Sequence, residues 1–144
     1  AVADADHREY LRGRGGEDAV VSNLTILASQ QRRMERLWKK WADRLDMYGW
    51  DVTRTYHDGV FTQGDGRPSN GLVGSAHVGW EYRQAWIGWD ATELAKLDDQ
   101  HAEVALVHEI MHILLNEMRE RGIKHEERVA TTLAWNFVNM ERGQ

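Results

Sequence analysis

Apolar residues between residues 29 and 48 recur at steps of three and four, which is the spacing of one face of an α-helix. This stripe consists of Met34, Leu37, Trp38, Trp41, Leu45 and Tyr48. Gly49 follows directly, and glycine is typical of the position just after a helix end. The pattern therefore predicts an amphipathic helix from about Ser29 to Tyr48.

After Gly49 the pattern changes to alternation. Residues 50 to 56 (WDVTRTY) alternate and are rich in aromatic and β-branched side chains, so they predict a strand. Asp58 and Gly59 then form a hairpin-type turn signal. This signal predicts that residues 60 to 62 return as a second strand.

Two further strands are expected between residues 72 and 89. The segments LVGSAHVGWEY and AWIGW carry strand-forming residues on either side of a turn near Arg83. Glycines in or beside these segments, at positions 71, 74, 79 and 88, indicate bulges or room for the close approach of a ligand. Residues 63 to 71, which hold the only proline, predict a loop before these strands.

Helical periodicity returns after Asp90. A short helical piece at residues 91 to 97 precedes a long helix, which Asp98 or Asp99 can cap and which is expected to end near Arg121. A last helix is predicted from about Lys124 to Glu141. Its inward positions are expected to be Val129, Ala130, Leu133, Ala134, Phe137 and Met140.

The order of these segments, a helix followed by strands and then by helices, predicts an α+β domain. The length of 144 residues fits one domain with a single core. Residues 1–19 are polar and predict a mobile N-terminal arm, with at most a helical turn around His7 to Leu11. The domain itself is expected over residues 20–144.

Composition narrows the classes of protein that fit. The net charge of -5 argues against a protein whose whole surface binds nucleic acid. The chain has no cysteine, which excludes disulfides, thiolate zinc ligands and a cysteine nucleophile and fits a reducing compartment. No apolar run approaches the ~20 residues that span a bilayer. We therefore expect a cytoplasmic protein with neither a membrane nor a nucleic acid as partner.

The segment VALVHEIMHILLNEM, residues 104 to 118, places two histidines and a glutamate in an otherwise apolar helix. His108 and His112 lie one turn apart on one face, so both imidazoles can bind one Zn²⁺. Glu109 lies about 100° further round the helix, where it can reach a water on the same metal but cannot join as a ligand. The pattern favours a zinc site over the alternative of two histidines hydrogen-bonded in a core.

A catalytic zinc ion usually takes three protein ligands and a water, so a third ligand is expected downstream. Leu115 and Met118 stand where the metzincin pattern needs Gly and His, which excludes that arrangement. The next metal-capable groups are the consecutive residues His125, Glu126 and Glu127. Neighbours on a helix point about 100° apart, so at most one of these three suits the zinc.

The motif HEIMH followed by HEERVATTLAWNFV resembles the minimal gluzincin-type zinc peptidases, which include phage and bacterial ImmA/IrrE-like proteins. In these proteins a glutamate on the next helix completes the site. Glu127 matches that position, while Thr131 replaces the usual Asn and Leu133 the usual Phe. Two alternatives stay open: Glu126 aligns better with the apolar stripe, and His125 would give the three-histidine site of SprT-like proteins.

The resemblance also implies a fold. We expect a zincin-like α+β domain with an N-terminal helix, a small twisted and mostly antiparallel sheet of three or four strands, an active-site helix and a C-terminal helix. In zincins an edge strand lines the cleft and pairs with the substrate backbone. By this resemblance, His77 or Tyr82 could stabilise an oxyanion. His101 shares the face of His108 but is expected at the surface.

These inferences predict a zinc-dependent metallopeptidase that acts on a protein or peptide substrate. One Zn²⁺ would be held by His108, His112 and Glu127, and Glu109 would be the general base. The alternative is a zinc-binding protein-interaction domain without catalysis. The intact Glu109 argues against this alternative, because a purely structural zinc site has no use for a base.

Overall fold

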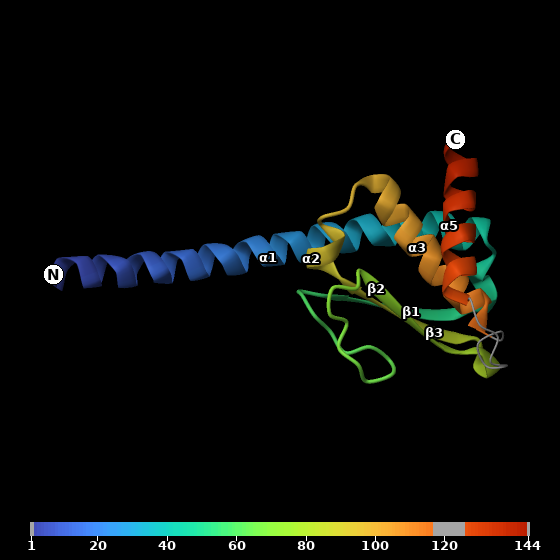
Figure 1. The fold of residues 1–144 in the computed structure, drawn as a ribbon, viewed down its shortest axis with the longest axis horizontal. Helices are drawn as coiled ribbons and strands as arrows, with labels where there is room; N and C mark the ends of the chain where they lie inside the picture. The colour runs from blue at the N-terminus through green and yellow to red at the C-terminus, as the bar shows by residue number, and fades with distance from the viewer. Residues whose placement is uncertain (1, 117–125, 144) are drawn as a thin grey trace.

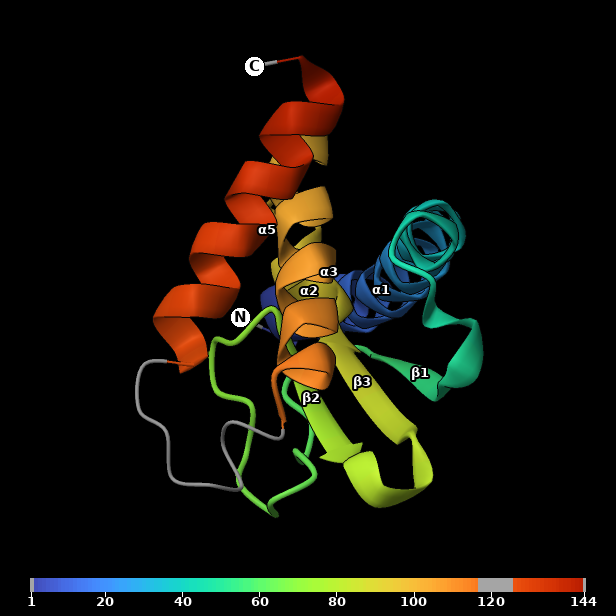
Figure 2. The same cartoon turned by 90° about the vertical axis from the view of Figure 1, so that its right-hand side faces the viewer.

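The computed structural model describes residues 2–116 and 126–143, with side chains from residue 22 onward except that of Arg128. In this part of the chain it is an α+β fold with a three-stranded sheet and four α-helices. The helices lie on one side of the sheet (Figure 2). None of the described helices combines the length and apolarity needed to cross a membrane.

Helix α1 (Val2–Arg44) begins much earlier than Ser29, the start that the sequence predicts. Residues 2–19, where the sequence predicts at most a helical turn, also have helical backbone, although three glycines there cost about 1 kcal/mol each in a helix. Their mobility as an arm stays a prediction. Figure 1 shows this end of α1 as a rod that projects past the domain. From Arg33 onward the helix packs on the core, with Met34 and Trp41 buried.

The sheet contains β1 (Asp51–His57), β2 (Gly74–Gly79) and β3 (Gln84–Asp90) in the order β1-β3-β2. β2 pairs with β3 in antiparallel orientation across a tight turn, in which Arg83 has φ 51°. β1 pairs with the other edge of β3 in parallel. The expectation of a mostly antiparallel sheet is therefore wrong for one of the two pairings, because β1 reaches β3 by a crossover and not by a hairpin.

The predicted hairpin after Asp58-Gly59 is also wrong. Gly59 does turn the chain, with φ 109°, but residues 60 to 62 do not join the sheet. The loop closes on itself instead: the backbone N–H of Phe61 donates to Ser69 Oγ at 2.9 Å, and the N–H of Ser69 donates to the Phe61 carbonyl at 2.8 Å. Phe61 is thereby held against the sheet by its ring and not by a strand pairing.

The core lies between the sheet and the helices. Ala85, Ile87 and Trp89 alternate along β3 toward the helices and are buried. β3 ends at Asp90, whose carboxylate caps α2 (Ala91–Leu94), and Asp98 caps α3 (Asp99–Leu114) by accepting the His101 N–H at 2.8 Å. The end of this helix that the sequence places near Arg121 lies outside the described residues.

Helix α5 (Glu126–Arg142) packs along α3. The buried residues of its contact face are Ala130, Ala134 and Val138. Met140, which the sequence predicts to point inward, is 74% exposed, and Val138 takes the inward place. The step of four between the buried residues keeps two small alanines at the contact, so the two helices can approach closely.

A buried carboxylate joins three helices. Glu103 of α3 is 1% exposed and accepts hydrogen bonds from Lys40 (2.7 Å) and Trp41 (2.9 Å) of α1 and from Arg142 (3.0 Å) of α5. Burial alone would raise the pKa of Glu103, but these three donors outweigh it and hold the pKa below its usual 4.5. The carboxylate is therefore ionised and fully partnered at neutral pH.

We expect Glu103→Gln to destabilise the fold by about 3 kcal/mol, the low end for breaking a buried pair, because Lys40 and Arg142 still reach solvent. The folded-state pKa is lowered, so this stabilisation is present above pH 4.5 and is lost as the pH falls below it. Urea unfolding of both proteins at neutral pH and at about pH 3 measures the difference. Glu141→Gln, at a more exposed pair, should cost within about 1 kcal/mol. An equal cost for both variants would contradict the role of Glu103.

Candidate metal centre

Two imidazoles, those of His108 and His112, face each other on one side of α3. The Nε2 atoms of His108 and His112 are 2.9 Å apart, and the ring centroids are 4.7 Å apart. Both residues are half-buried. This is the result of their spacing of four residues, which places them one above the other on one helix face.

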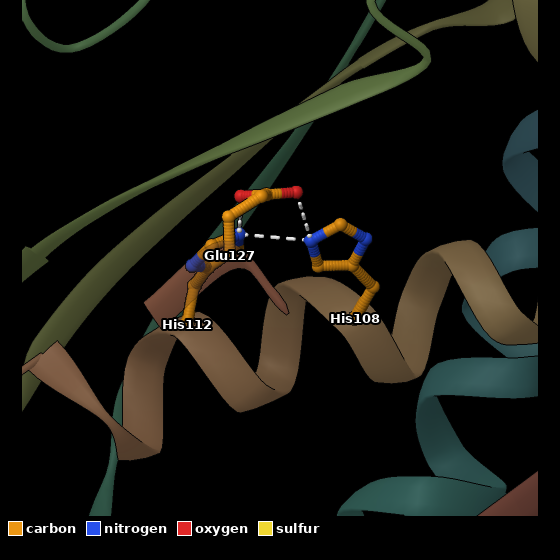
Figure 3. Close-up of side chains that lie close together, drawn as sticks. All are labelled: His108, His112 and Glu127. Atoms are coloured by element: carbon orange, nitrogen blue, oxygen red, sulfur yellow. Dashed lines mark hydrogen bonds and ion pairs between the residues drawn. The ribbon is translucent and has the colours of Figure 1, made fainter. Parts of the chain in front are cut away.

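Glu127, in the first turn of α5, completes the group (Figure 3). One carboxylate oxygen is 2.8 Å from His108 Nε2 and the other is 2.9 Å from His112 Nε2. The ligand-capable atoms of all three residues lie within 4.8 Å of one another. Donors around a tetrahedral zinc are roughly 3.3 Å apart, since each bond is about 2.0–2.1 Å, so these atoms are as close as a coordination shell requires.

Glu126, the residue before Glu127, contacts His112 from the opposite side. Its carboxylate oxygen lies 2.8 Å from Nδ1 of His112, and Glu126 is buried. A carboxylate on Nδ1 makes that nitrogen the N–H donor, so a neutral His112 presents an unprotonated Nε2. The structure thus places Glu126 behind the imidazole and not among the atoms that converge in front of it.

The converging atoms fit a cation. When His112 is neutral, its Nε2 lone pair faces a carboxylate oxygen of Glu127 at 2.9 Å, which is unfavourable without a positive charge between them. Burial lowers the pKa of His108, although the charge of Glu127 opposes this shift, so His108 is mainly neutral at neutral pH. Two imidazoles and a carboxylate form the His₂Glu donor set of catalytic zinc sites.

Glu109 lies beside this group but outside it. It is buried, and its Oε2 has no hydrogen-bond partner among the described residues. Burial raises the pKa of Glu109 to about 7; His112 and a backbone hydrogen bond from Ala76 oppose the rise, and the charge of Glu127 adds to it. A carboxylate with such a pKa can both take and release a proton near neutral pH.

The three metal-capable residues and Glu109 open into a cavity of about 360 Å³. Its other walls are β2 and the loop between β1 and β2, which runs beside β2 in Figure 2. Of the two oxyanion candidates, His77 lines this cavity, whereas Tyr82 is 81% exposed on the turn after β2 and is not part of the lining. His101 is exposed, 2.7 Å from Asp98.

The structure therefore brings His108, His112 and Glu127 together and sets Glu109 beside them, while His125 lies outside the described residues. Sequence reasoning missed the contact of Glu126 with the back of His112 and the backbone hydrogen bond from Ala76. The adjacency of Glu126 to Glu127 is a sequence signal for the contact with His112. No pattern of side chains in the sequence indicates the backbone hydrogen bond from Ala76.

In comparisons with known proteins, no protein-family model, curated protein or solved structure matches this chain. The resemblance to gluzincin-type peptidases thus depends on the two short motifs around His108 and Glu127. The geometry of the site brings residues of both motifs together, because His108 and His112 of α3 meet Glu127 of α5.

Proposed function

We propose that the protein is a zinc-dependent peptidase. The observation that carries this proposal is the convergence of two imidazoles and one carboxylate on a single point, with a second, buried carboxylate beside them in the same cavity. A purely structural zinc site is closed by protein ligands on every side. Here the converging atoms line an open cavity, so a substrate can reach them.

His108, His112 and Glu127 would hold the ion, and Glu126 would fix the ring of His112 by accepting its Nδ1 proton in a hydrogen bond. When bound, zinc polarises the scissile carbonyl and lowers the pKa of a bound water to about 7. Glu109, which lines the same cavity, would take a proton from the attacking water and release it to the nitrogen of the leaving amine.

The free edge of β2 would bind the substrate backbone. The N–H of Asp90 donates to the Val73 carbonyl, and hydrogen-bonded pairs alternate along an antiparallel ladder. The backbone groups of Gly74 and Ala76 therefore point away from β3, toward the cavity that these residues line. The N–H of Ala76 already donates to Glu109, so the N–H and carbonyl of Gly74 and the carbonyl of Ala76 remain for a peptide. An extended peptide can pair with them as an added strand. His77, the remaining oxyanion candidate, lies in the same cavity wall, but its ring is directed to Trp86, on the face of the sheet away from the helices.

The proposal is tested by incubating the zinc-loaded protein with a broad peptide mixture and identifying products by mass spectrometry. Cleavage is expected with zinc, should stop with 1,10-phenanthroline and should return when zinc is added back. A protein that binds zinc tightly and cleaves nothing in the mixture would be a zinc-binding interaction domain instead.

Glu126→Gln should weaken zinc binding by about 10–100-fold, the usual effect of removing a carboxylate behind a ligating histidine. Gln has the same shape but lacks the negative charge that makes His112 a stronger ligand. Competition with a chromophoric chelator measures the affinity. Glu81→Gln, the same change at an exposed position, is the matched control and should leave the affinity unchanged. Equal affinities for the two variants would contradict the role of Glu126.

A further inference from the structure

A second cavity, of about 460 Å³, lies on the face of the sheet that the described helices do not cover. Trp86, His77 and Gly88 form part of its wall, together with His57 of β1. Phe61 closes it from the loop between β1 and β2. Trp86 is 43% exposed, which is unusual for so large an apolar side chain.

Two glycines allow the loop to form this cavity. A Cβ on Gly88 would lie 2.6 Å from the ring of Phe61, and a Cβ on Gly64 would lie 2.4 Å from the ring of His77. The space beside Gly88, where the sequence left room for a ligand, is therefore occupied by the ring of Phe61, and the loop glycine Gly64 packs against the ring of His77. Phe61 is further fixed by a stacked contact with His57, at 4.7 Å between ring centroids. The cavity wall is thus built from packed rings.

This cavity adjoins the candidate metal centre. Gln63, Gly64, Ser75 and His77 line both cavities, so the two are separated only by this shared wall. A peptide paired with the free edge of β2 would direct alternate side chains to opposite faces of the sheet. Substrate side chains on the helix side of the sheet would enter the cavity at the candidate metal centre, and those on the other side would enter the second cavity.

The chemistry of the lining defines the occupant. Among the described residues that line the cavity, none is Asp, Glu, Lys or Arg. The rings of His77 and Trp86 are 5.8 Å apart and tilted by 41°, and Trp86 is 43% exposed, so part of its ring can contact an added aromatic side chain. Aromatic side chains gain from such edge-to-face and offset contacts in addition to the apolar area that they bury. A charged side chain would lose its hydration without gaining a partner.

We propose that this cavity is a specificity pocket for an aromatic or large apolar side chain of the peptide substrate. The proposal rests on the proposed peptidase function. Side chains of the substrate that alternate with those facing the metal centre would enter the pocket from the edge of β2. The substrates are therefore peptides with Phe, Tyr, Trp or Leu at one fixed distance from the bond that is cleaved.

Cleavage-site profiling with a proteome-derived peptide mixture tests the pocket. Wild type should enrich aromatic and large apolar residues at one position relative to the scissile bond, with kcat/KM for matched Phe and Ala peptides differing by about tenfold or more. Trp86→Ala should remove this preference. Thr55→Phe, which fills the pocket from an exposed position of β1, should do so as well. Tyr48→Ala, which removes an exposed ring far from both cavities, should keep the preference.

A binding measurement that needs neither metal nor catalysis separates this proposal from the proposed function. N-acetyl-phenylalaninamide should shift the NMR signal of the Trp86 indole N–H in wild type, and N-acetyl-alaninamide should not. A shift without any peptide cleavage would support the pocket and overturn the peptidase. Cleavage without a positional preference and without a shift would overturn the pocket and leave the peptidase standing.

Discussion

Glu109→Gln is expected to lower peptide hydrolysis by about 10²–10⁴-fold, the usual contribution of a general base, while zinc stays bound. The amide has the size of the carboxylate, so it fits the same buried position under Ala76. It cannot take a proton from water at neutral pH. Zinc should remain because Glu109 is not among the residues that converge on the metal position.

Two measurements are needed for this variant. The zinc content per chain shows whether the site is intact, and the rate on a peptide cleaved by wild type shows the loss of catalysis. Glu93→Gln makes the same change on α2, at a carboxylate that pairs with Lys96, and should keep wild-type rates. A Glu109→Gln protein that is fully loaded with zinc and fully active would rule out Glu109 as the base.

His112→Ala should lower the zinc affinity by about 10²–10⁴-fold. Structural zinc sites bind with about 10–16 kcal/mol in total, so the loss of one ligand removes about 3–5 kcal/mol. The change also leaves the carboxylate of Glu126 without the imidazole that it contacts at 2.8 Å. Competition with a chelator gives the affinity, and hydrolysis should fall in parallel because the remaining ligands hold the ion weakly.

His101→Ala is the matched control for His112→Ala, since it removes an exposed imidazole from the same helix. It should change neither zinc affinity nor activity, although it removes the contact with Asp98. If both histidine variants bind zinc as tightly as wild type, the metal is held elsewhere and the assignment of the site is wrong.

The sequence predicts those parts of the fold that depend on local patterns. Asp98, one of the two expected caps, does cap the helix that holds the metal-capable histidines, and the predicted strand AWIGW lies within β3. The strand order depends on contacts between distant residues, and no local pattern encodes it. The turn at Gly59 illustrates this: it is a correct turn signal, but the hydrogen bonds between Phe61 and Ser69 hold residues 60 to 62 in the loop, so they do not pair with the free edge of β1.

The candidate site shows the same division. The spacing of His108 and His112 alone places the two rings on one face, so their meeting was predictable. The choice between Glu126 and Glu127 was not, because it depends on how α5 is rotated against α3. That rotation is set by Ala130, Ala134 and Val138 at the helix contact, several residues away from the carboxylates.

The three metal-capable side chains differ in solvent exposure, and this difference affects the order in which they would bind an ion. The side chain of Glu127 is 70% exposed, whereas those of His108 and His112 are 23% and 14% exposed. A cation from solution would meet the carboxylate first and could pass from it to the two rings while the protein stays folded. Loading and release would then be governed by the surrounding metal supply and not by unfolding, so a folded apoprotein could be charged with different divalent ions in turn.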